Sequence, residues 1–265
     1  MPTPLDILLD PVSLSILAMY ALLMIWEAFF PGRKLPHIKF WKLRGLLVFT
    51  FYFFFTSYLP MFINPWLEPF RLLDLSFLGT FGGAAVGVLL YELGVFLWHR
   101  QMHRSDFLWK TFHQMHHSAE RVDTYGAFYF SPMDMIGWTV LGSICFAFLV
   151  GLSPQATTAT ILFTNFLSIF QHANIKTPHW LGYLIQRPES HTYHHARGIH
   201  KMNYSDLPLF DLIFGTFHNP KTFEHETGFY EGASARIPEM LMFKEISGDN
   251  NNTTEKNMSD EQRAA

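Results

Sequence analysis

Histidine spacing constrains this chain more than any other feature of its sequence. A His-x-x-His-His pattern occurs twice, at residues 113–117 and 191–195, and a His-x-x-x-His pair at residues 99–103 precedes the first copy. On a helix, positions i, i+3 and i+4 fall within an arc of about 100°. We therefore predict that each copy is helical and presents its three imidazoles toward one point.

Neutral imidazole is the commonest protein ligand for transition metals, and eight clustered histidines are too many for one ion and suit two. Imidazole binds Zn, Fe, Cu and Ni. We favour two iron ions that use O2 as a co-substrate, and zinc can occupy the same site in purified protein because it binds such donors more tightly. The candidate metal ligands are His99, His103, His113, His116, His117, His191, His194 and His195.

His172 is a ninth candidate ligand, because it directly follows an apolar segment, as His99 does. Glu92 lies two helical turns before His99, where it either orients a ligand histidine or pairs with a neighbouring helix. Five further histidines lack the motif spacing, and two of them, His179 and His200, are the best spares for the metal site. The other three are His37, His218 and His225.

The apolar residues of the chain are gathered in blocks. The chain is 49% hydrophobic and only 15% charged, which is a low charge for a soluble domain of 265 residues. Three blocks reach the length of about 20 residues that a spanning helix needs, and two more are slightly short. We predict an all-α integral-membrane bundle of about four to five spanning or partly penetrating helices with a helical, His-rich metal-binding cap. The blocks are residues 13–30, 45–62, 75–98, 135–150 and 156–170.

Basic residues between the first two blocks predict the orientation in the membrane. Residues 33–44 contain five Lys and Arg side chains, and loops with such an excess remain in the cytoplasm. The N-terminus is then outside, and the metal site and the C-terminus are cytoplasmic. The expected organisation is N-terminal membrane spans (1–98), a cytoplasmic His-motif segment (99–134), a membrane helical hairpin (135–172), a cytoplasmic His-motif cap (173–245) and a disordered tail (246–265).

Two further features exclude classes of site and partner. Cys145 is the only cysteine, so an intrachain disulfide and a thiolate metal site are both excluded. The net charge is −3 and there is no basic run, which argues against a nucleic-acid partner.

The histidine patterns, in this order on a chain with several apolar blocks, resemble those of the fatty acid hydroxylase/sterol desaturase superfamily. The resemblance covers about residues 91–230. It implies an integral-membrane di-iron oxygenase that uses O2 and two electrons to hydroxylate or desaturate an unactivated C–H bond of a lipid. Besides the histidines, the similar segments are residues 112–118, 171–174, 203–204 and 211–216.

The resemblance also implies how the ligands divide between the two metals. Some members carry another histidine four residues after the one that matches His172, and this chain has Lys176 there. The second metal is then one ligand short, or is completed by water, Asn174 or a spare histidine. One metal would take His99, His103, His113, His117 and His194, and the other would take His116, His172, His191 and His195.

The residues do not distinguish hydroxylation from desaturation, and fatty acyl lipids, sterol-like lipids, carotenoids and aminolipids all fit as substrates. We expect the electrons to come from a separate cytochrome b5-, ferredoxin- or reductase-like protein. Two other classes of protein are alternatives. A metal transporter or sensor would place its ligands inside the spans rather than at their ends. A metal-dependent membrane hydrolase would need a carboxylate base, for which Glu120 and Asp123 are the nearest acids.

Overall fold

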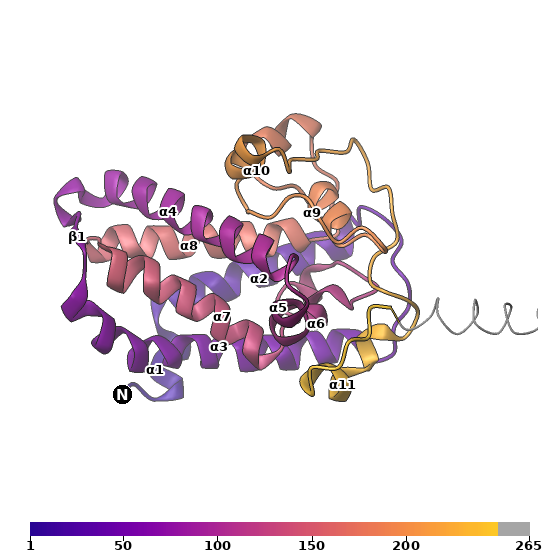
Figure 1. The fold of residues 1–265 in the computed structure, drawn as a ribbon, viewed down its shortest axis with the longest axis horizontal. Coiled ribbons are helices and arrows are strands. Elements are labelled where there is room, and N and C mark those ends of the chain that lie inside the picture. The colour runs from indigo at the N-terminus through magenta and orange to yellow at the C-terminus, as the bar shows by residue number, and fades with distance from the viewer. Residues whose placement is uncertain (249–265) are drawn as a thin grey trace, which may run out of the picture.

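The computed structural model describes residues 1–248, so most of the predicted tail at 246–265 lies outside the described residues. Five long helices run side by side, and short helices gather at one end of them (Figure 1). The structure confirms the all-α prediction. The five are α2 (Pro11–Phe29), α3 (Trp41–Leu67), α4 (Gly79–Met102), α7 (Pro132–Ser143), which continues into a π-helical segment (Ile144–Leu149), and α8 (Pro154–His172).

Four helical segments are long and apolar enough to cross a membrane. α8 lies in the same bundle and packs along α4, and it completes the five helices. The prediction of about four to five spanning or partly penetrating helices is confirmed. The four segments are Pro11–Phe29, Trp41–Phe70, Ser76–Met102 and Pro132–Leu149.

Small residues let α4 and α8 approach each other closely. A Cβ added at Gly87 would lie 2.6 Å from the Thr160 hydroxyl oxygen, and one at Gly83 would lie 2.8 Å from the Ala156 Cβ. Close approach through small residues is a common way to pack helices inside a membrane. The two helices run in the same direction, so their C-terminal ends, which carry the predicted ligands, lie at the same end of the bundle.

A short parallel strand pair joins the other ends of α4 and α8, and nothing in the sequence predicted it. β1 (Leu73–Asp74) pairs with β2 (Val150–Gly151) in parallel, with Leu73 opposite Val150. Each strand comes a few residues before its helix. The pair therefore fixes the level at which both helices begin.

The chain passes along the bundle five times between the N-terminus and the short helices at the other end. The Tyr58 hydroxyl, in the C-terminal half of α3, donates to the Pro2 carbonyl oxygen at 3.1 Å. The Trp41 indole, at the start of α3, donates to Asp123 at 2.9 Å. The N-terminal helix α1 (Pro4–Leu9) therefore lies at the opposite end of the bundle from the residues that follow the first histidine motif.

We call the region at that end, residues 103–131 and 173–246, the cap. It contains short helices and connecting segments, packed on a small core that includes Trp41, Met115, Tyr129 and Met240. α4 runs past residue 98, the predicted end of the first membrane region, because His99 lies in its last turn and His103 follows it directly. The cap helices are α5 (Asp106–Leu108), α6 (Gln114–His117), α9 (Pro188–His194), α10 (Pro208–Phe214) and α11 (Ile237–Leu241).

Candidate metal centre

The structure brings all nine predicted histidines together at the junction of the bundle and the cap. They form two groups, and within each group the ligand atoms lie within 4.8 Å of one another. This is the division that the family resemblance implied. Group one is His99, His103, His113, His117 and His194, and group two is His116, His172, His191 and His195.

The three imidazoles of one His-x-x-His-His copy do not share a single point, so that expectation was wrong. His113 and His117 belong to group one, whereas His116 belongs to group two. On a helix, positions i and i+4 are only about 40° apart, while i+3 and i+4 are about 100° apart. The first and last histidines therefore face one group and the middle one faces the other. The second copy divides in the same way.

Backbone carbonyl oxygens fix the orientation of three of the rings. The Nδ1 atom of His99 lies 2.7 Å from the Tyr204 carbonyl oxygen, that of His172 lies 2.7 Å from the Ser168 carbonyl oxygen, and that of His194 lies 2.6 Å from the Met202 carbonyl oxygen. A carbonyl oxygen can only accept, so each Nδ1 must carry the proton. The Nε2 atom of each ring is then left with a free lone pair, as in histidines that bind metal.

These lone pairs point at one another. The Nε2 atoms of His99 and His194 are 3.0 Å apart, and neither can carry a proton if Nδ1 donates to a carbonyl. Two lone pairs at this distance repel unless a cation lies between them. In group two, the Nε2 atom of His172 lies 3.0 Å from that of His116 and 2.9 Å from that of His191. The donor set therefore fits a metal in each group.

Burial keeps these imidazoles in the neutral form that binds metal. Removal from water, together with the neighbouring histidines, holds the pKa of the cap histidines well below the usual range for this residue. The affected side chains are His103, His113, His116, His117, His191, His194 and His195.

Asp134 supports the centre, and sequence reasoning missed it. Its carboxylate lies 3.3 Å from the Nδ1 atom of His113, and the side chain is fully buried at the start of α7. An acid at the start of an apolar segment is a signal that could have revealed it. The buried ion pair between Arg187 and Glu189, at 3.1 Å, was also missed. It lies at the start of α9, which carries His191 and His194.

Glu92 does not orient a histidine directly. Its carboxylate accepts hydrogen bonds from the backbone amides of Asp206 and Leu207, at 2.9 and 3.0 Å. These residues belong to the segment whose Tyr204 carbonyl oxygen accepts from His99. Glu92 therefore acts on the centre through the position of a cap segment.

The spare donors do not complete group two. His200 lies on the side of group one, where its Nδ1 atom is 3.1 Å from that of His117. The His179 ring bonds instead to the Asn219 carbonyl oxygen. The side-chain amide of Asn174 accepts from and donates to the backbone of Arg33. Lys176 is exposed. Group two therefore has four histidines among the described residues, against five in group one.

Glu27, inside the first apolar segment, ties two ligand-bearing segments together. One carboxylate oxygen accepts from the backbone amide and the hydroxyl of Thr124, both at 2.8 Å. The same oxygen accepts from the backbone amide of Asn174 at 2.9 Å. Thr124 follows the first histidine motif and Asn174 follows His172. Glu27 thus holds the two segments at a fixed distance.

Replacing Glu27 by alanine should therefore weaken both the fold and metal retention. Each buried donor that loses its acceptor costs about 1–3 kcal/mol. We expect Glu27→Ala to lower the unfolding temperature and the metal content of purified protein, and Glu27→Gln, which keeps an acceptor oxygen, to be milder. Thermal unfolding and metal analysis of the two variants test this. Equal metal content in Glu27→Ala and the unmodified protein would contradict the role of Glu27.

The chain is similar to known lipid-modifying proteins. The fatty acid hydroxylase family model matches residues 84–216, half of the chain. Ornithine lipid hydroxylase OlsE of Rhizobium tropici is 30% identical over 51% of this chain and 41% of its own length. Sphinganine C4-monooxygenase 1 of Arabidopsis thaliana is 25% identical over 59% of this chain and 62% of its own length. Very-long-chain aldehyde decarbonylase GL1-9 of rice (Oryza sativa) is 26% identical over 57% of this chain and 60% of its own length.

The matched region holds all nine histidines together with all of α8, and it ends in the cap, so the similarity follows the candidate centre. The matches span between 41% and 62% of the length of these relatives. No solved structure matches the chain significantly.

Proposed function

Because this chain belongs to the fatty acid hydroxylase family, we propose that it is a membrane-bound, O2-dependent oxidoreductase that uses two iron ions to hydroxylate or desaturate a C–H bond of a lipid. The observation that carries the proposal is the convergence of Nε2 atoms in two adjacent groups of buried histidines, with the unprotonated Nε2 atoms of His99 and His194 facing each other at 3.0 Å. The two groups touch, since the rings of His117 and His195 stack with centroids 4.1 Å apart.

Two bound iron ions would supply O2 activation, with two electrons from a separate donor. The chain's own residues keep the imidazoles neutral, fix their direction through carbonyl acceptors and exclude bulk water from the centre. Hydroxylation and desaturation share an oxidant, and the position of the second substrate hydrogen decides between them. Fatty acyl and sterol-like lipids are the substrate classes that we propose.

A cavity of about 520 Å3 inside the bundle offers a place for the lipid. It extends from Pro2 and Asp10, near the N-terminus, to Trp138 in α7. The Trp138 ring lies 5.8 Å from the His99 ring and 6.2 Å from the His113 ring, measured between centroids. An apolar chain in this cavity would therefore approach group one at Trp138.

We propose that the N-terminus is outside and that the centre and the C-terminus are cytoplasmic, where a cytochrome b5-, ferredoxin- or reductase-like donor can reach them. The five basic residues at 33–44 support this, since they lie at the same end of the bundle as the cap. Cysteine labelling on a Cys145→Ser background tests it. In intact cells, a cysteine near residue 5 should label and one at residue 245 should not. Labelling of the latter from outside would contradict the orientation.

A hydrolytic function is less well supported, because neither Glu120 nor Asp123, the acids that follow the first histidine motif, faces the histidines, and Asp134 contacts the Nδ1 atom of His113 while the Nε2 atom of that ring faces His99. Glu120 accepts from the Ser234 amide, and Asp123 accepts from Trp41 and Arg121. A metal hydrolase needs a carboxylate base beside its bound water.

Lipid extracts test the proposed function directly. Cells that make the protein should contain a lipid heavier by one oxygen, or lighter by two hydrogens, than its counterpart in cells that make His195→Ala. Mass spectrometry of both extracts measures this. Identical lipid profiles, with the protein present and loaded with iron, would contradict the proposal.

A further inference from the structure

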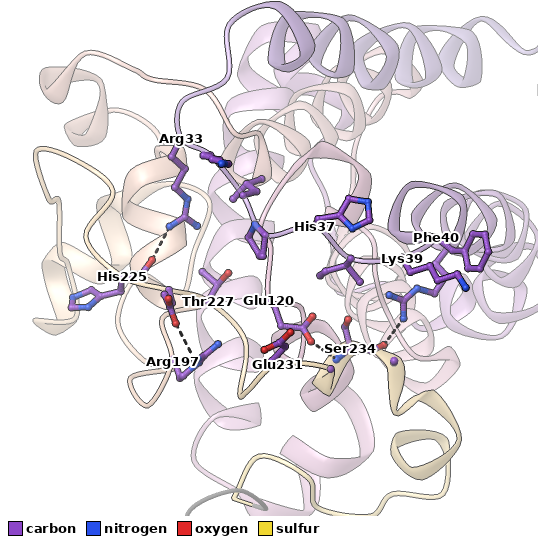
Figure 2. Close-up of a pocket in the computed structure, with 18 of the residues that line it drawn as sticks. Arg33, His37, Lys39, Phe40, Glu120, Arg197, His225, Thr227, Glu231 and Ser234 are labelled. Carbon is purple, nitrogen blue, oxygen red and sulfur yellow. Dashed lines mark hydrogen bonds and ion pairs between the residues drawn. The ribbon is translucent and has the colours of Figure 1, made fainter.

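A second and larger cavity, of about 1330 Å3, lies beside the cap (Figure 2). Its walls come from residues 33–47, which link α2 to α3 and begin α3, and from residues 223–235 of the cap, with Glu120 and Arg197 between them. None of the nine histidines lines it. It adjoins the ends of two segments that are long and apolar enough to cross a membrane, so we expect it at the level of the membrane surface. We call it the surface pocket.

One wall of the surface pocket is cationic and is not neutralised by carboxylates. Among the described residues, Arg33, Lys34 and Lys39 on this wall form no ion pair with an acid. Arg33 donates to the His225 carbonyl oxygen at 2.7 Å. Arg44 lies on the side of Glu120 instead, since it donates to the carbonyl oxygen of Ser234, whose amide donates to Glu120. Burial without a carboxylate partner lowers the pKa of Arg33 to about 10. Guanidinium and ammonium groups that have no carboxylate partner favour the binding of an anionic group, such as phosphate or carboxylate.

The other wall of the surface pocket is acidic. Glu120 is only 7% exposed, and although one carboxylate oxygen accepts from the Ser234 amide, the other has no partner among the described residues. Glu231, which is exposed, lines the same cavity, and Figure 2 shows both carboxylates in a part of the pocket away from Arg33. Glu226 is already paired with Arg197 at 3.0 Å. Free carboxylates in this position favour a ligand that carries an ammonium group or another hydrogen-bond donor.

The third side of the surface pocket is apolar and exposed. Phe40, Leu43 and Leu47 line it, and their side chains are 65%, 55% and 61% exposed. They lie just before and within the first turns of α3, which is long and apolar enough to cross a membrane. Hydrocarbon chains can lie along this face while a polar group occupies the pocket.

We propose that the surface pocket binds the headgroup of a zwitterionic lipid, one in which a phosphate or carboxylate lies a short distance from an ammonium group. The anion contacts the wall of Arg33, Lys34 and Lys39, and the ammonium contacts Glu120 and Glu231. The chains follow Phe40, Leu43 and Leu47. The site is separate from the candidate metal centre, so it does not depend on the reaction that we propose there.

Native mass spectrometry of the full chain, loaded with metal in detergent, tests this site. The probes are dihexanoyl phosphatidylethanolamine, which is zwitterionic, dihexanoyl phosphatidylglycerol, which is anionic, and free phosphoethanolamine. We expect one tightly bound phosphatidylethanolamine per chain and weaker binding of the other two. Free phosphoethanolamine that binds as tightly as the lipid would show a site for a soluble headgroup compound and overturn the lipid assignment.

Variants test the contributions of the cationic wall and of the acidic wall to lipid binding separately. Lys34→Ala combined with Lys39→Ala should weaken binding of both lipids roughly tenfold, as expected for two lysines near an anionic group. Glu231→Gln should weaken phosphatidylethanolamine several-fold and leave phosphatidylglycerol unchanged. Lys221→Ala and Glu245→Gln alter exposed charges outside the pocket and are the matched controls.

Two results would overturn the proposal. One is equal affinity of all variants for phosphatidylethanolamine, which would indicate lipid that merely coats the bundle. The other is an equal loss of both lipids in Glu231→Gln, which would remove the selectivity that the acidic wall explains. If the double lysine variant does not fold, Glu231→Gln alone decides the matter.

Discussion

Replacing His195 by alanine is expected to abolish turnover and to remove one of the two proposed metal ions, while the protein still inserts in the membrane. The Nε2 atom of His195 lies 3.1 Å from that of His191, in the group that has only four histidines. Even residues that only support a metal ligand change activity by 10–100-fold when they are lost, so loss of a ligand should exceed roughly a hundredfold. Product formation and metal content per chain measure the effect, and His116→Ala should behave in the same way.

His179→Gln provides the matched control. His179 lies outside both groups and bonds to the Asn219 carbonyl oxygen, to which glutamine can also donate. We expect this variant to keep two metals and its activity. Full activity in His195→Ala on a substrate that the unmodified protein converts would show that group two is not part of the centre.

Removing the metals is expected to destabilise the junction between bundle and cap. Without cations, the facing Nε2 lone pairs of His99 and His194 repel each other in a site that excludes water. A ligand present at a thousand times its dissociation constant stabilises the folded state by about 4 kcal/mol. For a chain of this size, that loss corresponds to an unfolding temperature lower by roughly 10 °C.

Thermal unfolding before and after chelation tests this expectation, and adding Fe2+ back should restore the original midpoint. Hydrogen exchange should increase in α6 and α9, which carry ligands of both groups, and change less in α3, which carries none. An unchanged unfolding temperature in protein shown to be free of metal would contradict the role of the histidines in holding the cap.

The parts of the molecule that could be predicted from the sequence are those encoded in local spacing. Apolar blocks specify the bundle because each has the length of a helix that crosses a membrane. The nine histidines could be found because eight follow helical spacing and His172 repeats the placement of His99 at the end of an apolar block. The division of each motif between two groups follows from the same helical geometry once i+3 and i+4 are considered separately.

The features that could not be predicted depend on contacts between distant segments. The carbonyl groups that orient His99, His172 and His194 belong to the backbone, so no side-chain pattern marks them. Glu27 bonds to residues 97 and 147 positions away. Sequence reasoning missed Glu27, although an acid inside an apolar segment is a signal of a buried partner; the signal does not say which partner. The surface pocket is formed by two segments nearly 190 residues apart, and in the sequence its basic residues indicated only the orientation in the membrane.

The measurement that tests the account most directly is metal analysis of protein purified from iron-supplied cells, combined with X-ray absorption at the iron edge. The account predicts two iron ions per chain with nitrogen and oxygen neighbours and no sulfur, because Cys145 is the only cysteine and lies in the bundle. His195→Ala and His113→Ala should each reduce the count. A single tetrahedral zinc ion in group one, with the histidines of group two unligated, would contradict it.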